Sequence, residues 1–115
     1  MFQVKDLFYK SDLIPVIVQD IHTKQVLMLG FANEEAVQKT FETRTAWFWS
    51  RSRQALWNKG DFFFNDTATT EIYTDCDTDT LLLMVEPAGP ACHTGAVSCF
   101  YQDLTAFPDC DCTRA

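Results

Sequence analysis

Carboxylates and thiols cluster at two places in the chain, and their types favour metal binding. The first cluster is DCDTD, which carries Asp75, Asp77 and Asp79 at alternate positions. In an extended segment these three carboxylates would share one face and Cys76 would point to the other. Three neighbouring carboxylates repel one another unless a cation lies among them, and hard oxygen ligands suit Mg²⁺. A solvated strand edge is the simpler explanation of this segment taken alone.

The second cluster is CHTGAVSC, which supplies Cys92 and Cys99. With Cys76 they make three thiolates, a set that forms a zinc site whose fourth position can hold water. Buried thiols often serve as small apolar side chains, so either cluster alone is weak evidence. The two clusters together favour a metal site. The place of His93 beside Cys92 leaves three roles open: ligand, general base or structural histidine.

Cationic side chains gather in SRSRQALWNKG, at residues 50–60. The segment holds Arg51, Arg53 and Lys59, and Arg51 and Arg53 share a face if the preceding strand continues through them, which would make a clamp for a phosphate. Trp57 suits either stacking on a base or covering the core. A solvated basic turn explains the same residues, so the pattern alone leaves both interpretations open.

Composition places these clusters in one small acidic domain that spans residues 1–115. The formal net charge of −7 argues against nucleic-acid binding, which needs a basic surface. No apolar run approaches the roughly 18 residues of a membrane helix, and the N-terminus lacks the apolar stretch of a signal peptide. We therefore expect a cytoplasmic protein that binds neither nucleic acid nor membranes. Its five cysteines are then expected to serve metal binding or catalysis rather than disulfides.

Hydrophobic patterning predicts the scaffold, an α+β domain of about six or seven short strands with one main helix. Two strands are expected in 13–32 around the turn at 20–25, and Pro15 would place the first at a sheet edge or a bulge. Residues 51–60 are expected to form a polar turn. The other expected strands are 45–52, 68–74, 80–87 and a last short one after the loop that holds Cys92 and Cys99.

The main helix is expected in NEEAVQKTFETR, at residues 33–44. Asn33 is a good N-cap, and the two glutamates that follow suit the positive end of the helix dipole. Ala36, Val37 and Phe41 are expected along one side. A helix this short does not stand alone, so we expect that side to pack against the sheet.

Four segments resemble the phosphoribosyl-AMP cyclohydrolase family of histidine biosynthesis. They are QDIHTKQVLMLGFANEEA, SRSRQALWNKG, DCDTDTLLL and PACHTGAVSCF, which occur in the family's order and spacing between about Leu13 and Tyr101. The resemblance implies an obligate homodimer that hydrolyses the N1–C6 bond of the adenine ring of phosphoribosyl-AMP to give the formimino-aminoimidazole carboxamide ribotide. The tail at 102–115 lies outside the resemblance, and its Cys110 and Cys112 match no ligand of the family.

The resemblance also implies how the two metal clusters are used. Zinc would be bound by Cys92 and Cys99 of one subunit and by Cys76 of the partner subunit, and Mg²⁺ by the three aspartates at 75, 77 and 79. Bound zinc lowers the pKa of water to about 7 and so supplies a hydroxide that attacks C6 of the ring. His93 is the candidate that moves the proton as the ring bond breaks.

For the substrate, the resemblance implies a binding role for the basic segment. Arg51, Arg53 and Lys59 would neutralise the phosphate together with Mg²⁺, and Trp57 lies in the same motif. Placed cations of this kind allow an acidic protein to bind an anionic substrate.

The chain departs from the family's pattern directly after WNKG. The family has a small polar Thr-Ser-Gly stretch where this chain has Phe62, Phe63 and Phe64. Open amides and small residues cradle a phosphate or a sugar, which benzyl groups do not. Two outcomes stay open: a divergent loop with one or two rings in the core, or a zinc-stabilised dimer with impaired catalysis. FFFNDTATTEIYT also resembles the peptide encoded by translated sequencing-adapter DNA, in which case residues 61–74 would not be the natural protein's.

Overall fold

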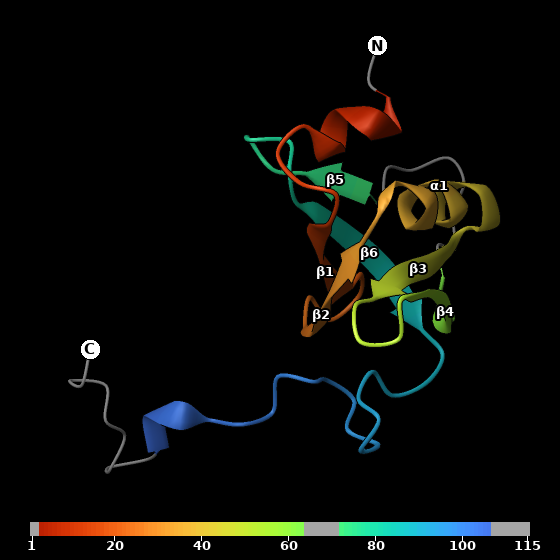
Figure 1. The fold of residues 1–115 in the computed structure, drawn as a ribbon. Coiled ribbons are helices and arrows are strands. Elements are labelled where there is room, and N and C mark those ends of the chain that lie inside the picture. Colours follow the sequence, from red (N-terminus) through yellow and green to blue (C-terminus); the bar gives the residue numbers. More distant parts are fainter. Residues whose placement is uncertain (1–2, 64–71, 107–115) are drawn as a thin grey trace.

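The computed structural model describes residues 3–63 and 72–106 of the chain. Figure 1 shows a sheet with a single α-helix beside it and a short 3₁₀ helix near the N-terminus. In chain order the elements are η1 (Val4–Phe8), β1 (Ile14–Asp20), β2 (Val26–Ala32), α1 (Glu34–Thr43), β3 (Thr45–Ser50), β4 (Ala55–Phe63), β5 (Ile72–Thr74), β6 (Leu81–Pro87) and η2 (Leu104–Ala106).

The described strands form one mixed sheet of six strands. Their order is β2-β1-β6-β4-β3, and β5 pairs with β6 beside that path. β1 runs parallel to β6, whereas the other pairs are antiparallel. The prediction of a small α+β domain with six or seven strands and one main helix is therefore confirmed.

The place of β1 in the sheet corrects the prediction for Pro15. β1 is an interior strand, with β2 on one side and β6 on the other. Pro15 pairs with Phe31 of β2, and the pairing with β6 starts one residue later, at Val16. The irregularity in β1 falls between Val18 and Gln19 rather than at the proline. An interior strand can hold this proline because it precedes the parallel ladder.

Helix α1 begins as its sequence predicts. The side chain of Asn33 accepts a hydrogen bond from the backbone N–H of Ala36 at 2.9 Å. At the other end Arg44 has a left-handed backbone, with φ of 60°, and its N–H donates to the carbonyl of Thr40. The prediction that Phe41 lies on the buried side is wrong, because Phe41 is 38% exposed and Thr40 is buried instead. At about 100° per residue, Thr40 lies between Ala36 and Val37 on the buried face, whereas Phe41 lies about 40° beyond Val37, at the edge of that face.

The core contains side chains from both halves of the sheet and from the helices η1 and α1. α1 packs against β3 and also contacts η1 and β2. The largest fully buried side chains are Leu7, Ile14, Val16, Val18, Leu27, Val37, Phe48, Phe62, Leu83 and Val85. These buried side chains hold the sheet together, and the candidate site residues lie in and next to its strands.

Two segments differ from their predicted structure, and two others lie outside the described residues. The basic turn comprises only residues 51–54, because β3 ends at Ser50 and β4 begins at Ala55. The expected last strand is absent from the described residues that follow β6, where the chain runs away from the sheet to η2 (Figure 1). The first part of the expected strand at 68–74 and the tail cysteines lie outside the described residues. Within those residues, no helix has the length and apolar character needed to cross a membrane.

Candidate active site

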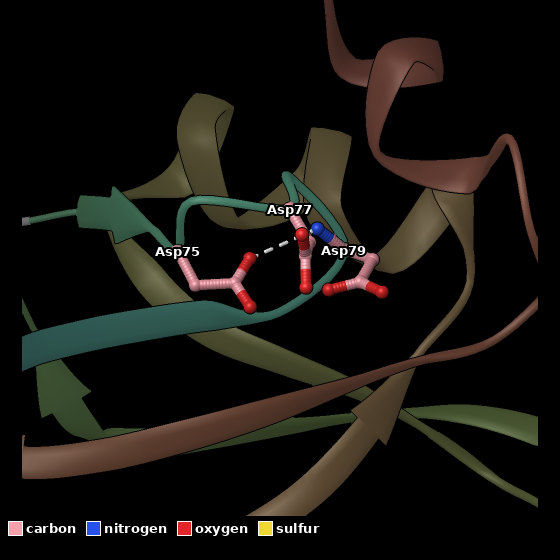
Figure 2. A group of neighbouring side chains, drawn as sticks. All are labelled: Asp75, Asp77 and Asp79. Carbon is pink, nitrogen blue, oxygen red and sulfur yellow. Dashed lines mark hydrogen bonds between the residues drawn. The ribbon is translucent and has the colours of Figure 1, made fainter.

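The three aspartates of DCDTD converge on the turn between β5 and β6. Ligand oxygens of Asp75, Asp77 and Asp79 all lie within 4.8 Å of one another. Figure 2 shows the three carboxylates gathered on one side of the turn, with the backbone N–H of Asp79 donating to Asp75 Oδ1 at 3.1 Å. This bond is the main cause that lowers the pKa of the Asp75 carboxyl below its ordinary value. The turn thus gathers oxygen donors of the kind that Mg²⁺ prefers.

A turn, rather than the extended segment that the sequence predicted, brings the three carboxylates together. Residues 75–80 form a tight turn in which Thr78 N–H donates to the carbonyl of Asp75 at 3.0 Å. Thr78 has a left-handed backbone, with φ of 57°. The predicted convergence is confirmed, but the turn rather than strand alternation produces it.

The two cysteines of CHTGAVSC are brought together by a loop after β6. Within the loop, Cys92 N–H donates to the carbonyl of Ala96 at 3.1 Å. The far end is fastened to β2, because Cys99 N–H donates to the carbonyl of Leu27 at 2.7 Å and Ser98 Oγ donates to that of Val26 at 2.7 Å. The loop therefore closes on itself at one end and is held by the sheet at the other. Cys92 is buried and Cys99 is exposed.

The two thiols differ in their electrostatics. The hydroxyl of Thr94, whose Oγ1 lies 3.0 Å from Cys92 Sγ, is the main cause that lowers the pKa of Cys92, and Lys59 adds to the effect. Although Cys99 is exposed as a residue, partial desolvation of its thiol is the main cause that raises its pKa, and the neighbouring Cys92 raises it further. The charge of Lys59 in β4 thus acts on both thiols. Sequence reasoning missed Thr94 and the anchoring serine at 98, although both lie inside the CHTGAVSC motif.

Cys76 and His93 do not complete this thiol pair within one chain. Among the described residues, the aspartates form the group of three or more possible metal ligands, and no such group contains the thiols. Cys76 is exposed on the aspartate turn, and His93 is exposed next to Cys92. One chain therefore offers two sulfur ligands at the loop and a third thiol at a separate place.

A hollow of about 590 Å³ is lined by two of the four predicted substrate residues. Arg51 and Trp57 line it, and the guanidinium of Arg51 lies 4.3 Å from the ring centroid of Phe31. Trp57 stacks on the buried ring of Phe48, with ring centroids 4.8 Å apart. The remaining lining residues are Met28, Leu29, Gly30, Phe31, Trp49 and Ser52.

Strand β2 joins this hollow to the thiol loop. Its first residues, Val26 and Leu27, hold the loop, and residues 28–31 line the hollow. At Gly30 an added Cβ would lie 2.7 Å from the ring of Phe48, so only glycine fits at this part of the wall. A hollow with one cation and an aromatic wall suits an aromatic anion.

The other two predicted substrate residues lie elsewhere. Arg53 occupies the exposed turn that follows β3, where its N–H donates to Ser50 Oγ, so it does not continue a strand face with Arg51. The prediction of a shared strand face is wrong, because the chain turns at Gln54, whose φ is 51°. Lys59 lies near the thiols instead of the hollow.

The first phenylalanine of the divergent stretch belongs to the core. Phe62 lies in β4 opposite Pro87 of β6, and its side chain is fully buried. This position agrees with the interpretation that one ring enters the core. Phe63 is described as part of β4, and Phe64 lies outside the described residues.

Comparison with known proteins identifies the class to which this fold and site belong. The model of the family described as phosphoribosyl-AMP cyclohydrolase matches residues 28–101, which include the hollow, the aspartate turn and the thiol loop. The chain belongs to the phosphoribosyl-AMP cyclohydrolase family. The sequence prediction of this enzyme family, and with it of a hydrolase in histidine biosynthesis, is confirmed.

Curated relatives place the chain within the family. It is 53% identical over 103 residues to a phosphoribosyl-AMP cyclohydrolase of Clostridium botulinum (strain Kyoto / Type A2), covering 88% of this chain and 94% of that protein. It is 55% identical over 104 residues to a histidine biosynthesis bifunctional protein HisIE of Lactococcus lactis, covering 90% of this chain but 49% of that protein. The chain therefore spans about half the length of the bifunctional relative and nearly all of the shorter one.

Proposed function

We propose that this chain hydrolyses the N1–C6 bond of the adenine ring of phosphoribosyl-AMP, as a cytoplasmic homodimer that uses zinc and magnesium. The observation that carries the proposal is the joined pair of sites on β2. Its first residues hold the Cys92–Cys99 loop, and its next residues line a hollow with Arg51 and Trp57. The strand that anchors the thiol loop would thus also hold the nucleotide base, and ring hydrolysis needs substrate and metal to be positioned relative to each other.

The thiol pair accounts for a shared zinc site. Zinc in proteins takes four ligands, and a catalytic site keeps one position open for water. Cys92 and Cys99 supply two ligands, and the exposed Cys76 of the partner subunit would supply the third. Zinc, when bound, lowers the pKa of water to about 7 and so makes a nucleophile available near neutral pH. This division of ligands would explain why, among the described residues of one chain, two thiols meet and the third lies apart.

The chain's own side chains then bind the substrate and move its proton. Trp57 and the apolar wall would cover the base, while Arg51 would pair with the phosphate. His93, exposed beside Cys92, would give a proton to N1 as the ring opens. The three aspartates of the turn would hold Mg²⁺, which together with Lys59 and Arg53 would balance the negative charge of the substrate.

The experiment is an assay of this exact chain with phosphoribosyl-AMP, Zn²⁺ and Mg²⁺. We expect turnover in the wild type, and loss of both bound zinc and turnover in Cys92→Ala. Cys110→Ala removes a thiol from the tail and is the matched control, which should keep both. Turnover that survives Cys92→Ala at the wild-type rate would rule out the zinc mechanism.

A second candidate function is a zinc-stabilised dimer with impaired catalysis, because the family's Thr-Ser-Gly stretch is absent. Restoring all three residues would confound the test, since Phe62 is fully buried and its loss would open the core. Phe63→Ser with Phe64→Gly restores the small residues and leaves Phe62 in place. If the chain binds zinc without turnover and this double variant gains turnover, the impaired dimer is favoured. If the wild-type chain already turns over, the second candidate is excluded.

A further inference from the structure

The N-terminal segment docks on the aspartate turn, although about 70 residues separate them in the sequence. Lys10 Nζ lies 3.2 Å from Asp79 Oδ2, and the Tyr9 hydroxyl donates to the backbone carbonyl of Asp77 at 2.5 Å. Figure 2 shows the ribbon of the N-terminal helix beside the turn on the Asp79 side. Two adjacent residues therefore contact the turn: Tyr9 binds the backbone of the turn, and Lys10 binds a carboxylate of the candidate metal group.

The helix that leads to Lys10 is anchored in the core. Leu7 of η1 is fully buried, and η1 also contacts α1. Its first turn is closed by the Asp6 side chain, which accepts from Gln3 N–H at 2.9 Å. The segment leaves this anchored turn with Tyr9 and Lys10 directed at the aspartates. Lys5, in the same helix, is exposed and is not among the partners of the turn.

The negative charge of the turn can be balanced either by the Lys10 ammonium or by a divalent metal ion. Ligand oxygens of the three aspartates lie within 4.8 Å of one another, so their negative charges repel and favour a cation. The Lys10 ammonium supplies one positive charge to this group through Asp79. A divalent cation that took the same oxygens would lie close to the ammonium, and the two like charges would repel.

We propose that Lys10 is a tethered counter-cation of the aspartate turn, which competes with a divalent metal ion for Asp79. The inference rests on the magnesium site of the proposed function and adds its regulation. Lys10 keeps the turn assembled and its charge balanced when the metal is absent, and metal binding releases the lysine. Linkage then requires reciprocity: the factor by which Lys10 weakens metal binding is the factor by which the metal weakens the docking of Lys10.

The test measures Mn²⁺ binding directly, by the loss of the free-ion electron paramagnetic resonance signal, on the full-length protein. Mn²⁺ prefers oxygen ligands and so reports the aspartates rather than the thiols. Lys10→Met keeps the apolar stem and removes the charge, and we expect it to bind Mn²⁺ about threefold more tightly, a modest factor because the pair is partly exposed to water. Lys5→Met removes the same charge from the same segment and should leave the affinity at the wild-type value, as should Lys10→Arg.

A second readout tests the reciprocal effect. Hydrogen exchange of residues 4–10 should rise when Mg²⁺ is added to the wild type and should not respond in Asp79→Asn, which lacks the shared carboxylate. Equal or weaker Mn²⁺ binding by Lys10→Met overturns the inference, and weaker binding would mean that Lys10 orients Asp79 for the metal. If neither the wild type nor Lys10→Met binds Mn²⁺, the magnesium site itself fails, and the adenine-ring assay shows whether the proposed reaction survives without it.

Discussion

At the scale of single residues, Asp20 is a buried carboxylate whose charged form the folded state stabilises. It closes the turn between β1 and β2 by accepting from the N–H groups of His22 and Thr23, at 2.8 and 3.2 Å. Burial acts to raise the pKa of Asp20, but these hydrogen bonds outweigh it, so the pKa lies below the ordinary value of 3.8. The folded state therefore prefers the charged form more strongly than the unfolded state does.

This preference sets a pH dependence of stability. Asp20 contributes stability above its unfolded pKa of 3.8, and the contribution is lost as the pH falls through the lower folded pKa. Asp20→Asn should thus lower the free energy of unfolding at neutral pH, with a difference from wild type that shrinks toward about pH 3. Urea denaturation across this range measures it, with Asp12→Asn, at an exposed position, as control. A difference that stays constant with pH would contradict the assignment.

Phe62 permits a prediction on the most unusual stretch of the sequence. Because its side chain is fully buried, Phe62→Ala should destabilise the domain by about 3–5 kcal/mol through lost burial and an unfilled cavity. Phe41→Ala, at a side chain that is 38% exposed, should cost much less. Chemical denaturation compares the two variants. Equal small losses would mean that the ring at 62 can leave the core without consequence.

The sequence predicted some of these residues because their chemistry is local. The three aspartates lie within five residues, so any compact backbone brings them together, and a turn did so as well as a strand would have. Lys59 shows the opposite case. Its proximity to Cys92 and Cys99 depends on where β4 lies relative to the loop after β6, and no local pattern encodes that placement.

At the scale of elements, α1 is the one for which sequence signals and structure agree most closely. Asn33 accepts from Ala36 N–H at the helix start, as expected for an N-cap. Asn33→Ala should therefore lower the free energy of unfolding by about 1 kcal/mol, whereas Asn33→Ser keeps a capping oxygen and should cost less. Thermal or urea unfolding of the two variants checks this. An Ala variant as stable as the Ser variant would show that the cap contributes nothing.

The strands were predictable as segments but not as neighbours. Apolar runs predict β1, β2 and β6 correctly, since burial dictates their composition. The parallel pairing of β1 with β6 joins residues more than 60 positions apart, and this pairing makes β1 interior despite Pro15. The end of β3 was misjudged for a local reason: the left-handed backbone at Gln54 turns the chain at a residue that carries no strong turn signal.

At the scale of the whole molecule, the segment after β6 exposes apolar side chains that a lone chain leaves uncovered. Val97, Phe100, Tyr101 and Leu104 are each at least 55% exposed, and Figure 1 shows this part of the chain leading away from the sheet. Exposed apolar groups that lie close together in a chain favour contact with another protein surface. In the proposed homodimer, the second copy would cover them and bring its Cys76 to the thiol loop.

The shared site gives a prediction that only a dimer can fulfil. Cys76→Ala and Cys92→Ala chains each lack a ligand in both sites of their own homodimer, so each alone should be inactive. The two variants are mixed, unfolded and refolded together so that heterodimers form. In each heterodimer, one site carries both substitutions and the other site carries neither and is intact. Random pairing makes half the dimers heterodimers, so about one quarter of the wild-type turnover and zinc should return. Refolding each variant alone is the control, and a mixture that stays as inactive as its components would exclude a site built from two chains.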